Sequence, residues 1–310
     1  MNTNIYIANT PFHLFVINTI IDNYYSNENK YRNIVVSTVS NGFYDNIKSS
    51  EVKRINRGLL SIRDIRKVKR IILKGENMHF FVPHLSNLFS SYFYHLSCNN
   101  KGNISVYYEG IALLYPSQIK KLFFVNFRRR FIAFCSGIYY KYWETLYPAE
   151  LCKNAVCYSP FNVKENRFRE LRKISFNRLP KTSNTSNILI LTSITTSNDS
   201  ICKIIDEVKN LMDKNTKYIY IKPHYKNKNI EKSVTDIKEK LRMDQVILLS
   251  KSIPIELLID NIDIKFIVSQ HFSSALLNLS LFFDLKDIVV IEDIRNEYIK
   301  EIAVSYNIIQ

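Results

Sequence analysis

The chain has 310 residues, of which 46% are hydrophobic and 23% charged. This is the composition of a globular protein, and the length suits two domains of about 150 residues each. Only six glycines and eight prolines occur, and no segment repeats, so collagenous, disordered and solenoid proteins are excluded. The net charge of +15 calls for an anionic partner: nucleic acid, an anionic membrane surface or a negatively charged substrate.

Apolar runs and helical patterns alternate along the first half of the chain. The run Asn4–Ala8 is followed by a turn at Asn9-Thr10-Pro11 and by a helical pattern over Phe12–Tyr24. The same criteria predict strands at Asn33–Val39, Met78–Val82 and Ile104–Tyr108, and helices at Ser50–Lys69 and Leu85–Ser97. Such alternation predicts a parallel sheet with helices on both faces.

The alternation stops in a polar, basic segment, Asn166–Ser186, which Pro180 interrupts. We expect the domain linker there, between one domain at 1–180 and another at 187–310. The second domain is predicted to contain strands at Asn187–Thr192, Lys217–Lys222, Gln245–Leu249, Phe266–Ser269 and Ile288–Ile291, and helices at Asp199–Met212, Ile230–Arg242, Ile255–Ile259, Ser273–Phe283 and Asn296–Ser305. The fold class is therefore α/β, with two Rossmann-like domains in a GT-B-type arrangement and a ligand cleft between them.

Ligands of such sheets bind beyond the carboxyl ends of the strands, so the turns there are the first candidates for chemistry. Lys222-Pro223-His224 closes one predicted strand. A lysine supplies a fixed cation for a phosphate, and an imidazole can donate a hydrogen bond or a proton to a departing oxygen. The alternative is an ordinary surface turn.

Two further features follow in the same domain. Ser273-Ser274 opens an apolar helix, where hydroxyls and backbone N–H groups form an anion site or a simple N-cap. Glu256, in a Pro-x-Glu that opens a short helix, suits the two hydroxyls of a ribose or merely complements the helix dipole. Together with the lysine and histidine, these residues describe a nucleotide site.

The order Lys222-Pro-His224, Pro-x-Glu256, Ser273-Ser274 resembles the C-terminal half of bacterial GT-B sialyltransferases. In those enzymes a His-Pro motif, a ribose-binding glutamate and a Ser-Ser motif bind CMP. The resemblance implies that His224 is the general acid or a phosphate ligand, assisted by Lys222. It also implies that Glu256 holds the ribose and that both serines hold the phosphate.

The start of the chain adds a second likeness. Thr10-Pro11-Phe12-His13 looks like the Thr-Pro-x-Gln opening of the lipooligosaccharide sialyltransferases, glycosyltransferase family 52. His13 stands at the glutamine position and keeps a polar group at the cleft mouth. A departure occurs in the second domain, where Tyr225 stands at the position of the proline that usually follows the histidine.

The catalytic base has two candidates, because an inverting transfer needs a carboxylate to accept the proton of the acceptor hydroxyl. Glu109, in Tyr107-Tyr108-Glu109-Gly110, resembles the acidic-acidic-Gly motif of related sialyltransferases, although Tyr108 takes the first acidic position. Asp199 lies after the first strand of the second domain, where the lipooligosaccharide family carries an aspartate. Of the two, the sequence favours Asp199 as the base, with Glu109 as the alternative.

The charge distribution bears on partners and location. Lys120–Arg130 combines cations with aromatic residues, a composition that suits the headgroup region of an anionic membrane or a solvated helix flank. The N-terminus has no signal-like segment and no apolar run is long enough to span a bilayer, so we expect a cytoplasmic protein, peripheral on the inner membrane. The five cysteines, at positions 98, 135, 152, 157 and 202, lack metal-site spacing and are expected to be buried, reduced thiols.

The function predicted is transfer of sialic acid from CMP-sialic acid to a terminal galactose of a lipooligosaccharide or capsular glycan. The first domain would bind the acceptor and the second the CMP-sugar donor. No Asp-x-Asp pair occurs, so we expect neither a metal nor another cofactor. The alternatives are a GT-B transferase for another CMP-nonulosonate or a UDP-sugar, and a basic nucleic-acid-binding protein; no nucleic-acid-binding motif is present. Dimers occur among the relatives, so a homodimer is compatible with the resemblance.

Overall fold

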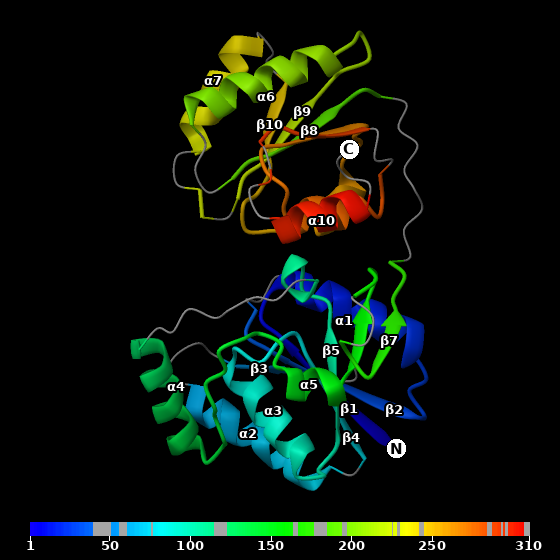
Figure 1. Ribbon diagram of the computed structural model, residues 1–310, viewed down its shortest axis with the longest axis vertical. Helices are drawn as coiled ribbons and strands as arrows, with labels where there is room; N and C mark the ends of the chain where they lie inside the picture. The colour runs from blue at the N-terminus through cyan, green and yellow to red at the C-terminus, as the bar shows by residue number, and fades with distance from the viewer. Residues whose placement is uncertain are drawn as a thin grey trace. The chain divides into compact units, whose positions relative to one another are not determined.

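The computed structural model describes residues 1–39, 51–55, 61–75, 77–114, 123–163, 167–176, 185–193, 197–224, 226–227, 230–241, 245–283, 287–292, 294 and 297–306. Contacts within the chain divide it into two units, Met1–Asn177 and Arg178–Gln310, and each unit contains its own sheet (Figure 1).

Seven described strands form the sheet of the first unit, in the order β3-β2-β1-β4-β5-β6-β7 and all parallel. Their bounds are Asn2–Ala8 (β1), Tyr31–Ser37 (β2), Glu51–Arg54 (β3), Met78–Val82 (β4), Asn103–Tyr107 (β5), Val156–Ser159 (β6) and Glu170–Lys173 (β7). The chain moves outward from β1 to β3, returns to β4 and moves outward the other way. The topological switch point therefore lies between β1 and β4, where ligands of such sheets bind.

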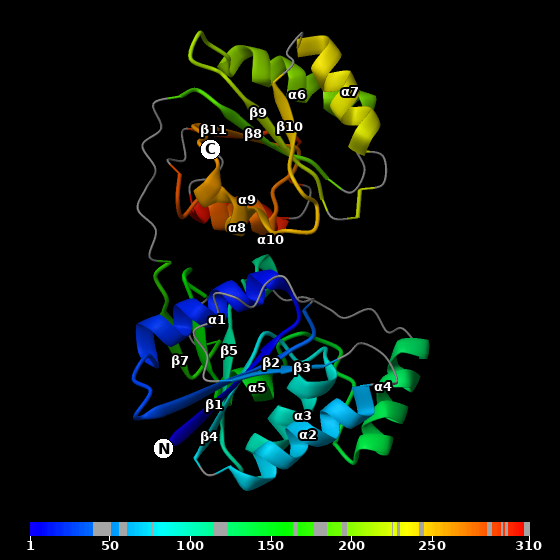
Figure 2. The ribbon, with the colours of Figure 1, turned by 180° about the vertical axis from the view of Figure 1, so that it is seen from behind.

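The helices of this unit are α1 (Pro11–Tyr24), α2 (Ser61–Lys74), α3 (Leu88–Cys98), α4 (Phe123–Ser136) and α5 (Ala149–Asn154). Helix α1 lies on one face of the sheet, and α2 and α3 lie on the other (Figure 2). The central strands are apolar on both sides, with Tyr6, Phe80 and Phe81 fully buried, as a sheet covered on both faces requires.

Two edge strands correct the sequence prediction. Glu51–Arg54 was assigned to the helix Ser50–Lys69, but it pairs with β2 as strand β3, and α2 begins only at Ser61. Glu170–Lys173 was assigned to the linker Asn166–Ser186, but it pairs with β6 as β7. Both segments are charged, as edge strands often are, and so they lack the apolar alternation by which strands are recognised. The most polar part of the predicted linker, Lys181–Asn184, lies outside the described residues.

The second unit has the parallel strand order β10-β9-β8-β11-β12 among its described residues. The strands are Ile188–Leu191 (β8), Ile219–Lys222 (β9), Val246–Leu248 (β10), Phe266–Ser269 (β11) and Ile288–Val290 (β12). The helices are α6 (Asn198–Leu211), α7 (Ile230–Leu241), α8 (Ile255–Leu258), α9 (Ser274–Leu279) and α10 (Glu297–Ser305). Its switch point lies between β8 and β11. All the strands predicted from the sequence are present.

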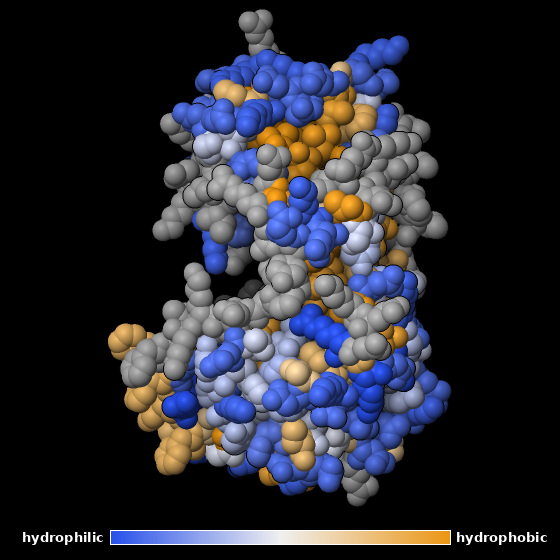
Figure 3. All heavy atoms as spheres, in the orientation of Figure 1, coloured by the Kyte–Doolittle hydropathy of each residue, from blue (hydrophilic) through white to orange (hydrophobic). Residues whose placement is uncertain are grey.

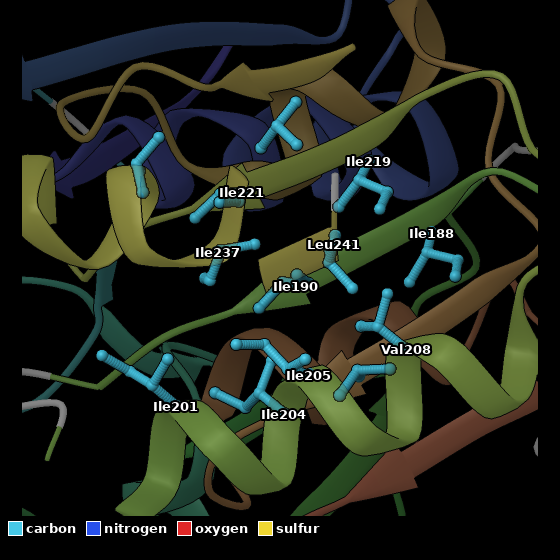
Figure 4. Close-up of a cluster of buried hydrophobic side chains, with 13 residues drawn as sticks. Ile188, Ile190, Ile201, Ile204, Ile205, Val208, Ile219, Ile221, Ile237 and Leu241 are labelled. Atoms are coloured by element: carbon cyan, nitrogen blue, oxygen red, sulfur yellow. The ribbon is translucent and has the colours of Figure 1, made fainter. Parts of the chain in front are cut away.

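The core of the second unit shows why α6 forms where it does. Four apolar residues at helical spacing point from α6 toward the isoleucines of β8 (Figure 4), namely Ile201, Ile204, Ile205 and Val208. Burial of each such side chain contributes about 1.5–3 kcal/mol. Ser197 caps the helix, because its side chain accepts a hydrogen bond from the N–H of Ser200.

All five cysteines are free thiols, as predicted, but their predicted burial holds only for Cys152 and Cys157. Cys98 and Cys202 are exposed, because they lie on the solvent-facing sides of α3 and α6. Within the described ranges, no helix is long and apolar enough to cross a membrane.

Candidate active site

Three ionisable side chains meet at the switch point of the first unit. His13 follows β1, His84 follows β4 and Glu109 follows β5, so they come from the carboxyl ends of three neighbouring strands. His84 Nε2 lies 3.2 Å from Glu109 Oε2, and His13 Nε2 lies 3.9 Å from the same oxygen. Parallel strands bring their carboxyl ends to one edge of the sheet, which explains how residues so distant in sequence come together.

The segment Thr10-Pro11-Phe12-His13 begins α1 and also orients the ring of His13 toward Glu109. Thr10 is the N-cap of α1, and its Oγ1 accepts a hydrogen bond from the N–H of His13 at 3.2 Å. Pro11 occupies the first helical turn, where its missing N–H costs nothing. His13 Nδ1 in turn accepts from the backbone N–H of Asn9, which fixes the ring with Nε2 toward Glu109. The structure thus gives Thr10 and Pro11 a capping role.

His84 is held in a strand–Pro–His turn after β4. Its Nδ1 accepts hydrogen bonds from the N–H and Oγ of Ser86, at 3.0 and 2.8 Å. Arg129 of α4 donates to the carbonyl oxygen of Ser86 and so ties this turn to the helix. Burial, and then the nearby charge of Arg129, lowers the pKa of His84 to about 4.

Glu109 is positioned by a turn that needs glycine. The next residue, Gly110, has φ 137°, which a residue with a side chain rarely adopts. The carboxylate is 12% exposed, and its Oε1 accepts a hydrogen bond from Tyr147 at 2.7 Å. Burial raises the pKa of Glu109 to about 8, although the bond from Tyr147 acts in the opposite direction.

The tautomers of the two histidines follow from their partners. Because each Nδ1 accepts from a backbone N–H, each neutral ring carries its proton on Nε2 and presents an N–H to Glu109. Burial, and then the charge of His84, lowers the pKa of His13 to about 3, so both rings are neutral at physiological pH. The carboxylate therefore faces neutral N–H groups of both rings, and its raised pKa suits a general base.

The turn after β9 repeats this geometry in the second unit. His224 follows Pro223, and its Nδ1 accepts from the N–H of Lys226 at 3.2 Å, so the neutral ring carries its proton on Nε2. Burial lowers the pKa of His224, and Lys226 and Lys222 lower it further. Tyr225, the departure from the sialyltransferase pattern, lies outside the described residues.

Lys222 ends β9 and is 9% exposed. Its Nζ donates to the carbonyl oxygen of Ser250 at 2.8 Å, which ties the turn after β9 to the turn after β10. Burial lowers its pKa to about 8, while Glu256 acts in the opposite direction. Lys222 and Glu256 are therefore electrostatic neighbours.

Hydrogen bonds join the turns at the switch point of the second unit. Asn227, three residues after His224, donates to the carbonyl oxygen of Ser193 at 2.9 Å. The N–H of Ser193, just after β8, donates to the side chain of Gln270 at 3.0 Å, and Gln270 directly follows β11. The His224 turn and the turn that leads to Ser273 are thus linked through one residue.

Ser273, Ser274 and Glu256 have defined structural roles here. Ser273 is the N-cap of α9, and its Oγ accepts from the N–H of Leu276 at 3.2 Å. Ser274 is the first residue of that helix. Glu256 is buried on α8 and accepts a hydrogen bond from Asn278 of α9, which fixes the two short helices together.

Asp199 has a different environment from Glu109. It lies in the first turn of α6, its side chain is 82% exposed, and it forms an ion pair with Lys203 at 3.6 Å. An exposed carboxylate one turn from a lysine is the usual pattern of a solvated helix face. Of the two carboxylates selected from the sequence, Glu109 is therefore mostly buried and hydrogen-bonded, whereas Asp199 is solvated.

His84 and Tyr147 were not among the residues selected from the sequence. His84 could have been found from the sequence, because Val82-Pro83-His84 repeats the strand–Pro–His arrangement of His224. No sequence pattern points to Tyr147, because it lies in a loop 38 residues from Glu109 and only the fold brings the two side chains together.

The family of the chain follows from a comparison of its sequence with family models. The model described as Alpha-2,8-polysialyltransferase matches residues 4–292. The chain belongs to this family. It is thus a glycosyltransferase of the sialyltransferase class, which confirms the resemblance to bacterial GT-B sialyltransferases. No curated protein matches the sequence.

Solved structures confirm the fold. The GT-B domain of the sialyltransferase from Photobacterium damselae aligns with a TM-score of 0.55 and 11% identity over 100% of this chain and 98% of its own. The 2,6-sialyltransferase of Photobacterium sp. JT-ISH-224, solved with CMP and lactose, aligns with a TM-score of 0.53 and 11% identity over 100% of this chain and 77% of its own. A UDP-N-acetylglucosamine 2-epimerase gives a TM-score of 0.54 and 11% identity over 98% and 82%. At these identities the likeness shows the GT-B-type α/β fold alone.

No group of three or more His, Cys, Asp or Glu is placed to hold a metal ion in the part of the chain that the structure describes.

Proposed function

We propose that this chain is an inverting sialyltransferase that uses CMP-sialic acid as its donor, with Glu109 as the catalytic base. The observation that supports the proposal most is the mostly buried carboxylate of Glu109, whose pKa is raised to about 8 at the switch point of the first sheet. A base works best when its pKa lies near the working pH, and strongly shifted groups concentrate at functional sites.

The proposed reaction is a single displacement at C2 of the sialic acid. Glu109 accepts the proton of the acceptor hydroxyl as the oxygen forms its bond to C2, while the bond from C2 to the phosphate oxygen of CMP breaks. The electron pair of that bond leaves with CMP. His84 and His13 direct N–H groups at the carboxylate and position it.

In the proposed reaction, residues of the second unit stabilise the departing CMP. His224 Nε2–H donates a hydrogen bond to the departing phosphate, and the Lys222 cation neutralises part of its charge. Ser273 and Ser274 contribute the start of α9 as phosphate ligands, and Glu256 binds the ribose, as in the sialyltransferases that the motifs resemble.

Variants of the two carboxylates test the base. Glu109→Gln keeps the hydrogen bond from Tyr147 but cannot accept a proton, so kcat should fall about 10²–10⁴-fold. Asp199→Asn is the matched control, because it removes an exposed carboxylate whose ion pair with Lys203 is worth little. CMP release from CMP-sialic acid is the readout. If only Asp199→Asn lost activity, the assignment of the base would be reversed.

The acceptor is open to two proposals. The first is the terminal galactose of a lipooligosaccharide or capsular glycan. The second follows from the family description, since an α-2,8 linkage joins C2 of the donor to O8 of another sialic acid. That acceptor is anionic and suits the net charge of +15. Incubation with CMP-sialic acid and either a galactoside or a sialoside, followed by linkage analysis of the product, separates them.

Two alternatives are tested by binding. If a UDP-sugar were the donor, UDP rather than CMP would raise the melting temperature in a thermal shift assay. If the protein bound nucleic acid, a filter-binding titration would show steep salt dependence without CMP binding. The proposal predicts stabilisation by CMP and not by UDP.

A further inference from the structure

Helix α4 presents a stripe of phenylalanines to solvent. Phe124, Phe127, Phe131 and Phe134 are 84%, 64%, 49% and 85% exposed. Figure 3 shows the corresponding orange patch over α4, at the lower left of the picture. Aromatic side chains bury more apolar area than most others, so leaving several of them in water is unfavourable. A contiguous row of exposed rings therefore indicates a surface that binds a partner.

The opposite side of α4 holds the helix on the protein. At about 100° per residue, the four phenylalanines fall within roughly a quarter of the helix circumference. Ile132 and Ala133 are buried on the inward side, where Arg129 also donates to Ser86. The stripe therefore faces away from the core of its own unit.

Cations surround the stripe. Arg128 and Arg130 are exposed, and their positions in the helical projection lie on either side of the four rings. Helix α2 packs against α4, and Arg66 of α2 donates to the carbonyl oxygen of Cys135 at 2.6 Å. Further exposed cations of α2 are Arg63, Lys67 and Arg70. Helix α4 contains no acidic residue.

We propose that this face docks the protein onto an anionic lipid bilayer. Helix α4 has 14 residues and a length of about 21 Å, so it lies in the plane of the surface rather than across it. The rings enter the boundary between headgroups and acyl chains, and the flanking arginines contact lipid phosphates. The predicted run Lys120–Arg130 contributes its described part to this surface, while Lys120 and Lys121 lie outside the described residues.

The same helix is connected to the proposed base. Arg129 bonds to Ser86, Ser86 bonds to His84, and His84 faces Glu109. Docking through α4 would thus hold the Glu109 edge of the sheet at a fixed distance from the membrane, where a membrane-borne acceptor glycan is anchored. This last step rests on the proposed function, whereas lipid binding by α4 does not.

Vesicle flotation tests the proposal with the full chain. The wild type should bind vesicles of phosphatidylcholine with about 30% phosphatidylserine and bind pure phosphatidylcholine far more weakly. Phe127→Ser/Phe131→Ser should lower the partition coefficient about tenfold or more. The matched control, Leu248→Ser/Val304→Ser, removes two exposed apolar side chains from the second unit and should bind as the wild type does.

A charge-reversal pair tests the cationic part. Arg128→Glu/Arg130→Glu should lower binding by about fivefold for each arginine, with the difference lost at high salt. Lys209→Glu/Lys238→Glu changes the net charge equally on α6 and α7, where both lysines are exposed, and should bind nearly as the wild type does.

Three results would overturn the proposal. One is equal binding of the phenylalanine variant and the wild type to anionic vesicles. Another is absence of wild-type binding together with a dimer, in sedimentation, that the phenylalanine variant dissolves; the stripe would then contact a second copy. The third is binding of RNA that depends on the same phenylalanines, together with no binding of the protein to vesicles. All these variants should still release CMP when the acceptor is soluble. This measurement therefore distinguishes failure of membrane docking from failure of the proposed reaction.

Discussion

Replacement of Tyr147 with phenylalanine tests the proposed base through its pKa. The hydroxyl of Tyr147 donates to Glu109 Oε1 at 2.7 Å and thereby lowers the pKa of a carboxyl that burial has raised to about 8. A hydrogen bond to a charged group contributes about 1.5–3 kcal/mol. One pKa unit corresponds to about 1.4 kcal/mol, so loss of the bond should raise the pKa of Glu109 by about one to two units.

The assay is the pH dependence of kcat/KM for CMP release, which reports the ionisation of the free enzyme. A base must be deprotonated to act, so the wild-type rate should rise about tenfold for each pH unit below 8 and level off above it. In Tyr147→Phe the midpoint should move to about pH 9–10. Tyr139→Phe is the control, because that ring is exposed and keeps its stacking on His95.

Some results would refute this reasoning. A wild-type profile that is flat between about pH 6 and 9 would indicate a base with the ordinary carboxylate pKa of about 4. A midpoint in folded Tyr147→Phe that stays in place or moves down would show that this hydrogen bond does not act on the base. Fluorescence of Trp143, the single tryptophan of the chain, checks that each variant of the first unit is folded.

Three further predictions concern stability and binding. His13 has a pKa lowered to about 3 by burial, so the unfolded chain binds a proton that the folded chain does not, and stability is lost as the pH falls below about 6.5. Between pH 7 and 5 the free energy of unfolding of His13→Gln should therefore fall by about 2 kcal/mol less than that of the wild type. Urea unfolding followed by Trp143 fluorescence measures this, and equal falls would contradict it. Lys222→Met should weaken CMP binding at least about tenfold in calorimetry, whereas Lys217→Met, two residues before β9, should not; equal affinities would remove Lys222 from the site. Ile204→Ala should destabilise the second unit by about 2–5 kcal/mol, measured by hydrogen exchange in α6, and a loss below about 1 kcal/mol would show that the core closes around the gap.

Most of the fold was predictable, because its central strands are apolar on both faces and its helices carry apolar residues at regular spacing. β1, β4 and β5 were found for this reason, and so was α6. The edge strands β3 and β7 were missed, since charged edges are recognised only by the strand with which they pair. The buried strand β6 and the helices α4 and α5 were not predicted either.

The candidate site divides in the same way. Glu109, His13 and His224 could be selected as candidates because turns after strands, and the motifs they carry, can be read locally. Tyr147 could not be found in this way, and the choice between Glu109 and Asp199 could not be made. Both depend on burial and on partners that are distant in sequence.

The sequence by itself therefore determined the alternation of strands and helices, the positions of the turns and the residue types that these turns display. The tertiary structure decided which of those residues share a buried environment and which face water. The physical reason is that patterns within a segment set its local conformation, whereas desolvation, and with it the pKa of a carboxyl, arises from every segment packed around the group.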